Sequence, residues 1–264
     1  MLNNATIEGL IELKLDCMAM AIKEQRSNPD YSDLPFEDRL GMLVDIEIQE
    51  RKNRRRRRLT AAAKMRTPAS IEDIDFRQRR GLDKSTMLTL AETMWVEEHH
   101  NVVLVGPAGV GKTYLACALL DAAIRHGHTA LYVRAPRLFE DLHIARGDGR
   151  YKRQMAALAR LDVLVIDDLF LQPLDTDQAA DFLEVIEDRH QLRSTILASQ
   201  LPVSDWHDAI GDGTMADAIM DRALHREHRI ELHGESMRSG NAGERWRTTE
   251  KAGDHADKST REED

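Results

Sequence analysis

Short apolar runs alternate with longer stretches of mixed polarity through the middle and the end of the chain. Such runs are typical of strands buried in a sheet, and the stretches between them are long enough for helices. A strand, a helix and a further strand in succession favour parallel pairing, because the chain must cross back before it continues in the same direction. The pattern predicts an α/β domain with a parallel sheet flanked by helices, and strands at 101–105, 129–133, 161–167, 194–199 and 229–232.

The amino-terminal region has a different pattern. Apolar residues recur there with helical spacing, first over Ile7–Ile22 and again over Phe36–Val44. The segment 27–30 separates the two groups and contains a proline, which is typical of a turn. We therefore expect a pair of helices that forms a small all-helical domain over residues 1–65.

A linker and a tail are expected on either side of the α/β domain. The helical pattern breaks near Pro68, and the chain beyond residue 238 is polar, charged and poor in aliphatic side chains. The predicted order after the helical domain is a linker at 66–76 that docks through Ile71, Ile74 and Phe76, an α/β domain at 77–238 and a disordered tail at 239–264.

The loop after the first predicted strand matches the phosphate-binding pattern GxxxxGK[ST]. Its glycines let the backbone curl so that N–H groups point at the β- and γ-phosphates of a nucleotide. Lys112 adds a positive charge, Thr113 carries a hydroxyl suited to Mg²⁺, and the following helix directs its positive dipole end at the phosphates. The sequence predicts that ATP and Mg²⁺ bind here, with the nucleotide contacted by Gly106, Pro107, Ala108, Gly109, Val110, Gly111, Lys112, Thr113 and Tyr114.

The third predicted strand ends in two carboxylates, Asp167 and Asp168. A buried strand that ends in acid, in a chain with a phosphate loop, is typical of a Walker B motif. We expect Asp167 to hold Mg²⁺ through water and Asp168 to orient or deprotonate the water that attacks the γ-phosphate. A helix cap is the alternative for this pair. Together the two motifs predict hydrolysis of ATP.

Polar residues also follow the fourth predicted strand. If that strand lies between the first and the third, its end aims Ser199 or Gln200 at the γ-phosphate and the attacking water. The alternative is that Gln200 only begins the loop before Pro202. We expect Gln200 to act as a polar sensor of the nucleotide.

Composition narrows the class and the compartment. The chain has 264 residues, a formal net charge of −9 and two cysteines. These cysteines are too few for a disulfide framework or a four-ligand zinc site, and no apolar run is long enough to span a membrane. A secretory signal pattern is also absent from the amino terminus. We expect a cytoplasmic protein without a membrane partner, and its negative charge argues against uniform coating of DNA.

Positive charge is nevertheless concentrated in local clusters. Arg54, Arg55, Arg56, Arg57 and Arg58 follow one another in the second predicted helix, without interleaved aromatic residues. Such a run can neutralise several DNA phosphates, whereas a solvated helix face is the alternative. Because stacking side chains are missing from the run, we expect sequence-tolerant binding to the DNA backbone rather than base readout.

Several segments together resemble the IstB family of insertion-sequence helper ATPases. They are the phosphate loop at 106–113, VLVIDDL at 163–169, TILASQLPVSDWH at 195–207, MADAIMDRALHR at 215–226 and IELHGESMR at 230–238. That family is related to the helicase loader DnaC and belongs to the AAA+ class of P-loop NTPases. The resemblance implies an ATPase that forms homo-oligomers on duplex DNA and prepares the target for a partner transposase. It also implies that ATP promotes assembly and that hydrolysis releases it.

The resemblance assigns roles to individual residues. Gln200 takes the sensor-one position, where many AAA+ proteins have Asn, and Asp168 replaces the more common catalytic Glu, which implies slow turnover. Arg222 resembles an arginine finger for the ATP of a neighbouring subunit and Arg238 a sensor-two arginine, with a solvated or ion-paired arginine as the alternative for each. Initiator-type relatives insert a helix toward nucleic acid between the second and third strands, where this chain has Arg146, Arg150, Lys152 and Arg153.

Two other functions fit parts of the sequence. A loader of a replicative helicase would use the same core with an amino-terminal domain that grips the helicase. A small-molecule kinase would need a second substrate pocket, and its activity would be indifferent to DNA. The basic amino-terminal helix and the breadth of the resemblance favour the transposition helper over both.

Overall fold

The computed structural model describes residues 2–237 of the chain. Its contacts divide the chain into two compact units that meet between Ala61 and Ala62. The predicted linker at 66–76 therefore belongs to the second unit. No helix in this described part is both long and apolar enough to cross a membrane.

The first unit is helical, but it contains three α-helices where the sequence predicts two. They are α1 (Leu2–Glu12), α2 (Asp16–Ser27) and α3 (Phe36–Ala63), with the 3-10 helix η1 (Pro29–Tyr31) before α3. The break between α1 and α2 falls at Lys14, whose φ of 59° is left-handed. There the N–H of Leu15 donates to the carbonyl of Leu10 at 2.8 Å, which is typical of a helix end. Apolar spacing continues across this break, so periodicity does not reveal it.

The second unit is built on a parallel sheet, as predicted. Its strand order is β2-β3-β4-β1-β5, which places β4 between β1 and β3. All neighbouring strands pair in parallel, so their carboxyl ends meet at one edge of the sheet. The strands are β1 (Asn101–Val105), β2 (Ala130–Arg134), β3 (Val163–Leu169), β4 (Ser194–Ser199) and β5 (Glu227–Glu231).

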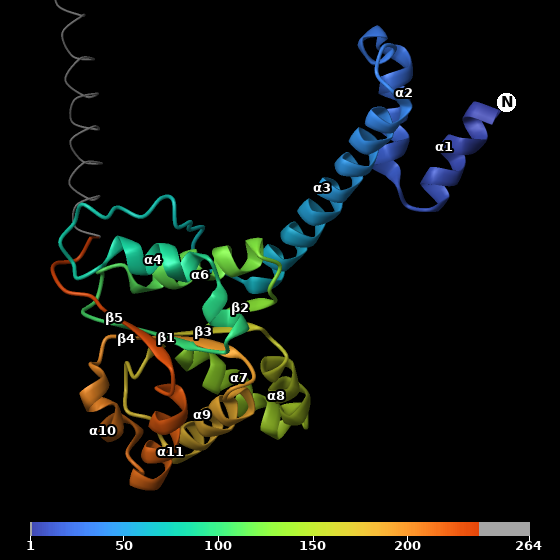
Figure 1. The fold of residues 1–264 in the computed structure, drawn as a ribbon. Coiled ribbons are helices and arrows are strands. Elements are labelled where there is room, and N and C mark those ends of the chain that lie inside the picture. The colour runs from blue at the N-terminus through green and yellow to red at the C-terminus, as the bar shows by residue number, and fades with distance from the viewer. Residues whose placement is uncertain (1, 238–264) are drawn as a thin grey trace, which may run out of the picture. The chain divides into compact units, whose positions relative to one another are not determined.

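Helices cover both faces of this sheet (Figure 1). One face carries α4 (Lys84–Ala91) and α6 (Lys112–Arg125), and α6 is buried over most of its length. The other face carries α7 (Ala135–Gly147), α8 (Tyr151–Ala159), α9 (Thr176–Arg189), α10 (Trp206–Ile210) and α11 (Gly213–Ala223). The short helices α5 (Met94–Glu97) and η2 (Val203–Asp205) precede β1 and α10.

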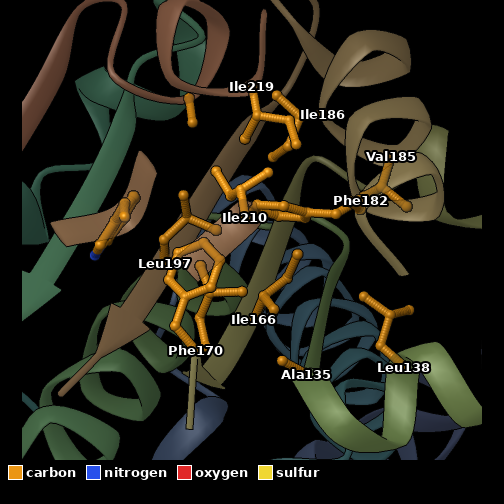
Figure 2. Close-up of a cluster of buried hydrophobic side chains, with 14 of the residues drawn as sticks. Ala135, Leu138, Ile166, Phe170, Phe182, Val185, Ile186, Leu197, Ile210 and Ile219 are labelled. Carbon is orange, nitrogen blue, oxygen red and sulfur yellow. The ribbon is translucent and has the colours of Figure 1, made fainter. Parts of the chain in front are cut away.

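A hydrophobic core cluster lies between the sheet and the second group of helices. Figure 2 shows Ile166 and Leu197 of the strands beside Phe182 of α9. The Phe182 ring makes edge contacts with Phe139 and Phe170, at centroid distances of 6.3 and 6.1 Å. Aromatic side chains bury large apolar areas and prefer such edge-on packing. This core holds α9 and the carboxyl half of β3 in a fixed relation.

Arg189, the last residue of α9, is a buried cation at the edge of the sheet where the strands begin. Its side chain is 1% exposed, and its Nη1 donates to the carbonyls of Leu158 and Leu161 at 2.6 and 2.9 Å. Its Nε donates to Thr195 Oγ1 at 3.0 Å, and its Nη2 donates to the carbonyl of Ser194. Burial lowers the pKa of Arg189 to about 9. One guanidinium thus satisfies backbone groups from α8, from β4 and from the turn before β3.

We predict that Arg189→Met lowers the free energy of unfolding of the second unit by about 3 kcal/mol, because buried carbonyls lose their donors. Urea unfolding followed by circular dichroism measures the loss. Arg193→Met is the matched control, since Arg193 is more exposed and lies 3.8 Å from Asp162, and its loss should stay under about 1 kcal/mol. Equal losses for the two variants would contradict this account of Arg189.

Candidate nucleotide-binding site

The phosphate loop joins the carboxyl end of β1 to the start of α6. Gly106, Gly109 and Gly111 have φ values of 146°, 84° and 101°, a region that residues with a side chain rarely adopt. Lys112 Nζ donates to the carbonyls of Gly106 and Pro107 at 2.7 and 2.8 Å, which holds the ammonium at the loop. The backbone therefore has the curled shape that a triphosphate requires, and the residues present fit ATP.

The strand β5 and the segment after it pack against this loop. A Cβ atom at Gly106 would lie 2.3 Å from the carbonyl oxygen of Leu232. The N–H of Met237 donates to the carbonyl of Gly109 at 3.0 Å. Arg80 is 5% exposed, and its Nη1 donates to the carbonyl of Val110 at 2.8 Å. Burial lowers the pKa of this guanidinium. These contacts leave the loop little freedom to change shape.

Asp167 of β3 lies beside the first turn of α6. Asp167 is only 1% exposed. The Thr113 hydroxyl donates a hydrogen bond to Asp167 Oδ2 at 2.6 Å. The hydroxyl of Tyr132, on β2, donates to the same oxygen at 2.6 Å. Burial and then this hydrogen bond raise the pKa of Tyr132 far above its usual value. A hydroxyl and a carboxylate that meet at a phosphate loop fit Mg²⁺, which prefers oxygen ligands.

The structure corrects the predicted end of β3. The strand does not end at Asp167 but continues to Leu169, with a shift of register between Ile166 and Leu169. Asp168 lies in this bulge with a left-handed φ of 57°, and its N–H donates to Asp167 Oδ1 at 2.8 Å. Left-handed backbone costs free energy in a residue with a side chain, and bulges often re-aim a side chain near an active site.

Asp168 carries two cationic neighbours that the sequence analysis does not place in the site. Arg134 Nε donates to Asp168 Oδ2 at 2.6 Å, and Arg66 Nη1 lies 3.6 Å from the same oxygen. The carboxylate is 18% exposed, so it faces the cleft while it is paired. Arg134 is the last residue of β2, at the carboxyl edge of the sheet. Because β2 lies next to β3, the strand order predicts that Arg134 lies near the acids at the end of β3. Arg66 lies before the sheet in the sequence, where no motif marks it.

One cleft of about 710 Å³, an ordinary volume for a small-molecule site, is lined by six of the nine predicted nucleotide residues. Gly106, Pro107 and Val110 do not line it. Asp168 and Gln200 line it, as the predicted roles in orienting water and sensing phosphate require. Arg66, Arg134 and Arg80 line it as well, so the cleft is rich in cations. The remaining lining residues are Thr67, Asp73, Ile74, Asp75, Ala108, Gly109, Gly111, Lys112, Thr113, Tyr114, Leu171 and Met237.

Arg222 lies far from the cleft of its own chain. It is near the end of α11, where its Nε pairs with Glu187 and its Nη1 donates to the carbonyl of Ala218 at 2.9 Å. The adjacent Ala223 carbonyl accepts from Asn101, the first residue of β1, at 3.0 Å. The phosphate loop begins at the other end of β1, which rises about 16 Å over its length. Arg238, the predicted sensor-two residue, lies outside the described residues.

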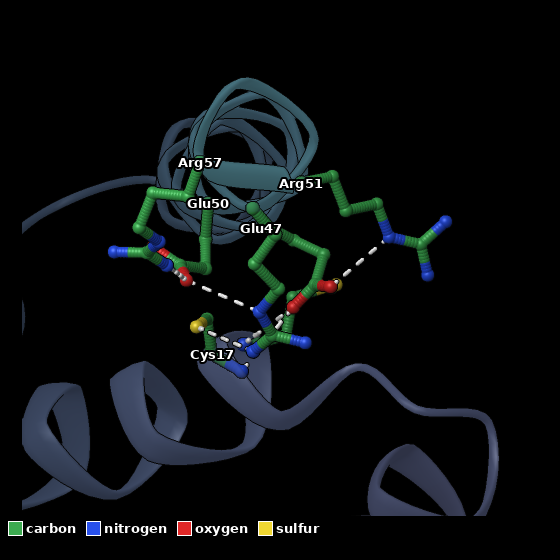
Figure 3. Close-up of polar contacts among 7 residues, drawn as sticks. Cys17, Glu47, Glu50, Arg51 and Arg57 are labelled. Carbon is green, nitrogen blue, oxygen red and sulfur yellow. Dashed lines mark hydrogen bonds and ion pairs between the residues drawn. The ribbon is translucent and has the colours of Figure 1, made fainter. Parts of the chain in front are cut away.

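The basic run on α3 is exposed. Part of it is paired within the first unit. Arg57 Nη2 lies 2.6 Å from Glu50 Oε1 (Figure 3), and Arg54 Nε lies 3.1 Å from the same oxygen. Successive helix residues are about 100° apart, so the five consecutive arginines surround the helix instead of following one face. They are Arg54, Arg55, Arg56, Arg57 and Arg58, and each is exposed.

In the second basic group, around α7 and α8, Arg146 and Arg150 contact carboxylates, whereas the other two residues are exposed. Arg146 pairs with the buried carboxylate of Asp181, and its guanidinium lies 3.8 Å from the centroid of the Tyr151 ring. Arg146 is therefore held in an ion pair with the second unit rather than left open to a phosphate. Arg150 Nε donates to Asp148 at 2.7 Å, whereas Lys152 and Arg153 are exposed on the first turn of α8.

The five-stranded parallel sheet and the loop between β1 and α6 give the chain the P-loop fold of the AAA+ class. Among solved structures, it is similar to DnaI with a TM-score of 0.54 and 23% identity, covering 64% of this chain and 95% of that one. It is similar to the DnaC helicase loader with a TM-score of 0.54 and 21% identity, covering 62% and 96%. At these identities the likeness shows the fold.

Sequence comparison identifies the family. The model of the IstB-like ATP binding protein family matches residues 9–244, and the chain belongs to this family. It is 44% identical over 238 residues to an insertion sequence ATP-binding protein of Sinorhizobium fredii, covering 90% of this chain and 97% of the relative. It is 46% identical over 205 residues to the ATP-binding protein of insertion sequence IS1162 from Pseudomonas fluorescens, covering 77% and 89%.

We predict that Gly106→Ala weakens ATP binding about tenfold or more, because it forces a Cβ against the Leu232 carbonyl at an unfavourable φ. Isothermal titration with ATP measures the dissociation constant. Gly147→Ala is the control, since a Cβ at this helical position meets nothing within 4 Å. If Gly106→Ala bound ATP as well as the control does, the loop would not be the rigid cradle described above.

Proposed function

We propose that this protein is an ATPase that assembles on duplex DNA and helps a partner transposase by selecting and deforming the target DNA. The observation that carries the proposal is one cleft lined by phosphate-loop residues, Asp168 and Gln200, with Asp167 hydrogen-bonded to Thr113 at its wall, in a chain of the IstB-like family. The named relatives are ATP-binding proteins of insertion sequences, which supports a role in transposition.

The residues of the cleft suit phosphoryl transfer to water. Lys112 and the loop N–H groups bind the β- and γ-phosphates, and Thr113 and Asp167 hold Mg²⁺, which neutralises phosphate charge when bound. Asp168 orients the attacking water and accepts its proton, while the Gln200 amide donates to the γ-phosphate or the water. Hydrolysis by this route requires positioning more than covalent chemistry, and it gives ADP and phosphate.

The position of Arg222 supports assembly into an oligomer. Because this arginine lies at the other end of β1 from its own phosphate loop, only the nucleotide of a neighbouring subunit can receive its guanidinium. The Glu187 pair must then open on assembly. We propose a homo-oligomer whose hydrolysis depends on subunit contact, so that ATP promotes assembly and its hydrolysis releases the particle. We propose that the oligomer acts in the cytoplasm. Arg238 is a further candidate contact to the nucleotide.

DNA contact is proposed for Arg54–Arg58 of α3 first, and for Arg150, Lys152 and Arg153 second. Arg146 is left out, because its guanidinium is held by Asp181. Arginines on all sides of a helix suit the phosphate backbone, which is attractive to cations irrespective of sequence. Binding of this kind tolerates many target sequences and weakens steeply with salt.

Light scattering with ATP or ADP, with and without a random-sequence duplex, tests the proposal. We expect particles that grow only with ATP and DNA, and faster ATP hydrolysis in the same samples. Lys112→Ala should abolish this growth, whereas Asp168→Asn should keep ATP binding and growth but lose nearly all hydrolysis. A particle that ignores DNA would instead favour a helicase loader. Equal, severe loss of ATP binding in both variants would contradict the separate roles of the two residues.

We predict that replacing Arg54–Arg58 with alanine weakens duplex binding and lowers its salt dependence. The log–log slope should fall by about one unit for each DNA phosphate that the variant no longer neutralises. Fluorescence anisotropy of a labelled duplex over a series of salt concentrations measures the slope. The comparison variant replaces Arg150, Lys152 and Arg153 with alanine. If only this second variant lowers the slope, the DNA surface lies on α8 and not on α3.

A further inference from the structure

The first unit exposes more of its large apolar side chains than it buries. Among its described side chains, the large apolar residues that are buried are Ile7, Leu43 and Leu59. Nine others are exposed, and six of these lie on α3: Phe36, Leu40, Met42, Val44, Ile46 and Ile48. A unit of about 60 residues needs most of its apolar surface for its own core. The exposed side chains therefore indicate a surface that a partner covers.

The helix α2 meets α3 along one line, at Leu43 and Glu47. These two residues are 6% and 4% exposed, and Glu47 Oε2 accepts the N–H of Cys17 at the start of α2 at 3.2 Å (Figure 3). Val44 and Ile48 directly follow the two covered residues, so they lie about 100° further around the helix. Both are exposed, which leaves the side of α3 next to α2 open to a partner.

Four of the exposed residues form one continuous ridge on α3. Phe36, Leu40, Val44 and Ile48 are each four residues apart, and their exposed fractions are 63%, 41%, 40% and 43%. Side chains at this spacing lie one above the other on a helix, and such a ridge packs into the groove between the ridges of a second helix. We call this row the apolar ridge, and its shape fits a helix.

The row beside the apolar ridge carries acids and a glycine. Glu37, Gly41 and Asp45 each directly follow a residue of the ridge, and all three are exposed. A Cβ atom at Gly41 would meet nothing within 4 Å, so the surface is open at this point. The carboxylates of Glu37 and Asp45 suit Lys or Arg on a partner that packs against the ridge, because complementary charges at the rim fix the orientation of the partner.

The charge of the amino-terminal region selects among the possible partners. Residues 1–50 contain eleven acidic and four basic residues, which gives a net charge of −7. A second copy of this chain would bring the same acids against one another, and like charges that meet at an interface cost free energy. Nucleic acid is repelled for the same reason. A helix that carries cations beside its apolar side chains complements both the ridge and its acids.

We propose that the apolar ridge and its acidic flank bind an amphipathic helix of a partner protein, one whose apolar stripe is bordered by Lys or Arg. The partner helix packs its stripe against Leu40 and Val44 and places its cations beside Glu37 and Asp45. This inference goes beyond the proposed ATPase cycle, because the first unit contributes no residue to the lining of the nucleotide cleft. Binding covers apolar surface that the first unit leaves exposed, so the partner also stabilises the folded state of that unit.

The test measures binding of three labelled peptides to the full chain by fluorescence anisotropy, without ATP or DNA. The first peptide is a helix of about 20 residues with Leu along one face and Lys on both borders of that face. The second has Glu in place of Lys, and the third has Ser in place of Leu. We expect the Lys peptide to bind at least about tenfold more tightly than the Glu peptide. The Ser peptide should not bind.

Variants of the full chain separate the apolar ridge from its acidic flank. Leu40→Ser with Val44→Ser should weaken binding of the Lys peptide about tenfold or more, because two apolar side chains leave the interface. Glu37→Gln with Asp45→Asn should weaken it about threefold and lower its dependence on salt. Leu192→Ser is the control, since Leu192 is 61% exposed on the second unit, and it should keep the wild-type affinity. Circular dichroism checks that each variant keeps its helix content.

Three results would overturn the inference. The first is no binding of the Lys peptide, or equal binding of the Lys and Glu peptides. The second is wild-type affinity in the Leu40 and Val44 double variant. The third comes from sedimentation without ATP or DNA: a wild-type dimer that becomes a monomer in this double variant would show that a second copy covers the ridge. We expect the same sedimentation for both.

The inference and the proposed function fail separately. The Leu40 and Val44 double variant alters neither the nucleotide cleft nor the basic run, so it should hydrolyse ATP and grow on DNA as the wild type does. If the wild type binds the Lys peptide but neither hydrolyses ATP nor grows on DNA, the proposed function is wrong and the inference stands. If it hydrolyses ATP and grows on DNA without binding the peptide, only the inference is wrong.

Discussion

The buried carboxylate of Asp167 is the group on which the nucleotide site depends. Its Oδ2 accepts hydrogen bonds from the hydroxyls of Thr113 of α6 and Tyr132 of β2, and its Oδ1 accepts one from the N–H of Asp168. A buried carboxylate without such donors would cost several kcal/mol, so these contacts matter for folding as well as for the site. They join β2, β3 and the start of α6, which sets the geometry of the cleft before a nucleotide is bound. A site built on a satisfied buried network is preorganised for charge, because little has to reorganise when phosphate arrives.

The segment before the sheet, which belongs to the second unit, is part of the same site. Arg66 and Asp75 line the cleft, while Ile71 and Ile74 are buried in the second unit. Asp168 in the same cleft lies between Arg134 and Arg66, so the segment before the sheet reaches the acid at the end of β3.

Charge on this protein is organised locally. The net charge of −9 coexists with a run of five exposed arginines on one helix. Acidic partners one helical turn before the run, such as Glu50, hold part of it and lower the repulsion among the arginines. A compact cationic element on an acidic protein concentrates attraction for anions at that element.

The sequence by itself determined the elements whose signals are local. Strand periodicity predicted the sheet, and the GxxxxGK[ST] loop with Asp167 and Asp168 predicted the cleft, because these patterns depend on residues close together in the chain. Tertiary structure decided the rest. The break at Lys14 interrupts a helix whose apolar spacing continues, and the bulge at Asp168 extends β3 past its predicted end. Arg146 forms an ion pair with Asp181, and Arg66 and Arg134 both form ion pairs with Asp168. Tertiary packing brings these partners together. Side chains far apart in the sequence come within reach only when the sheet and its helices are assembled, so no local pattern records which charges become partners.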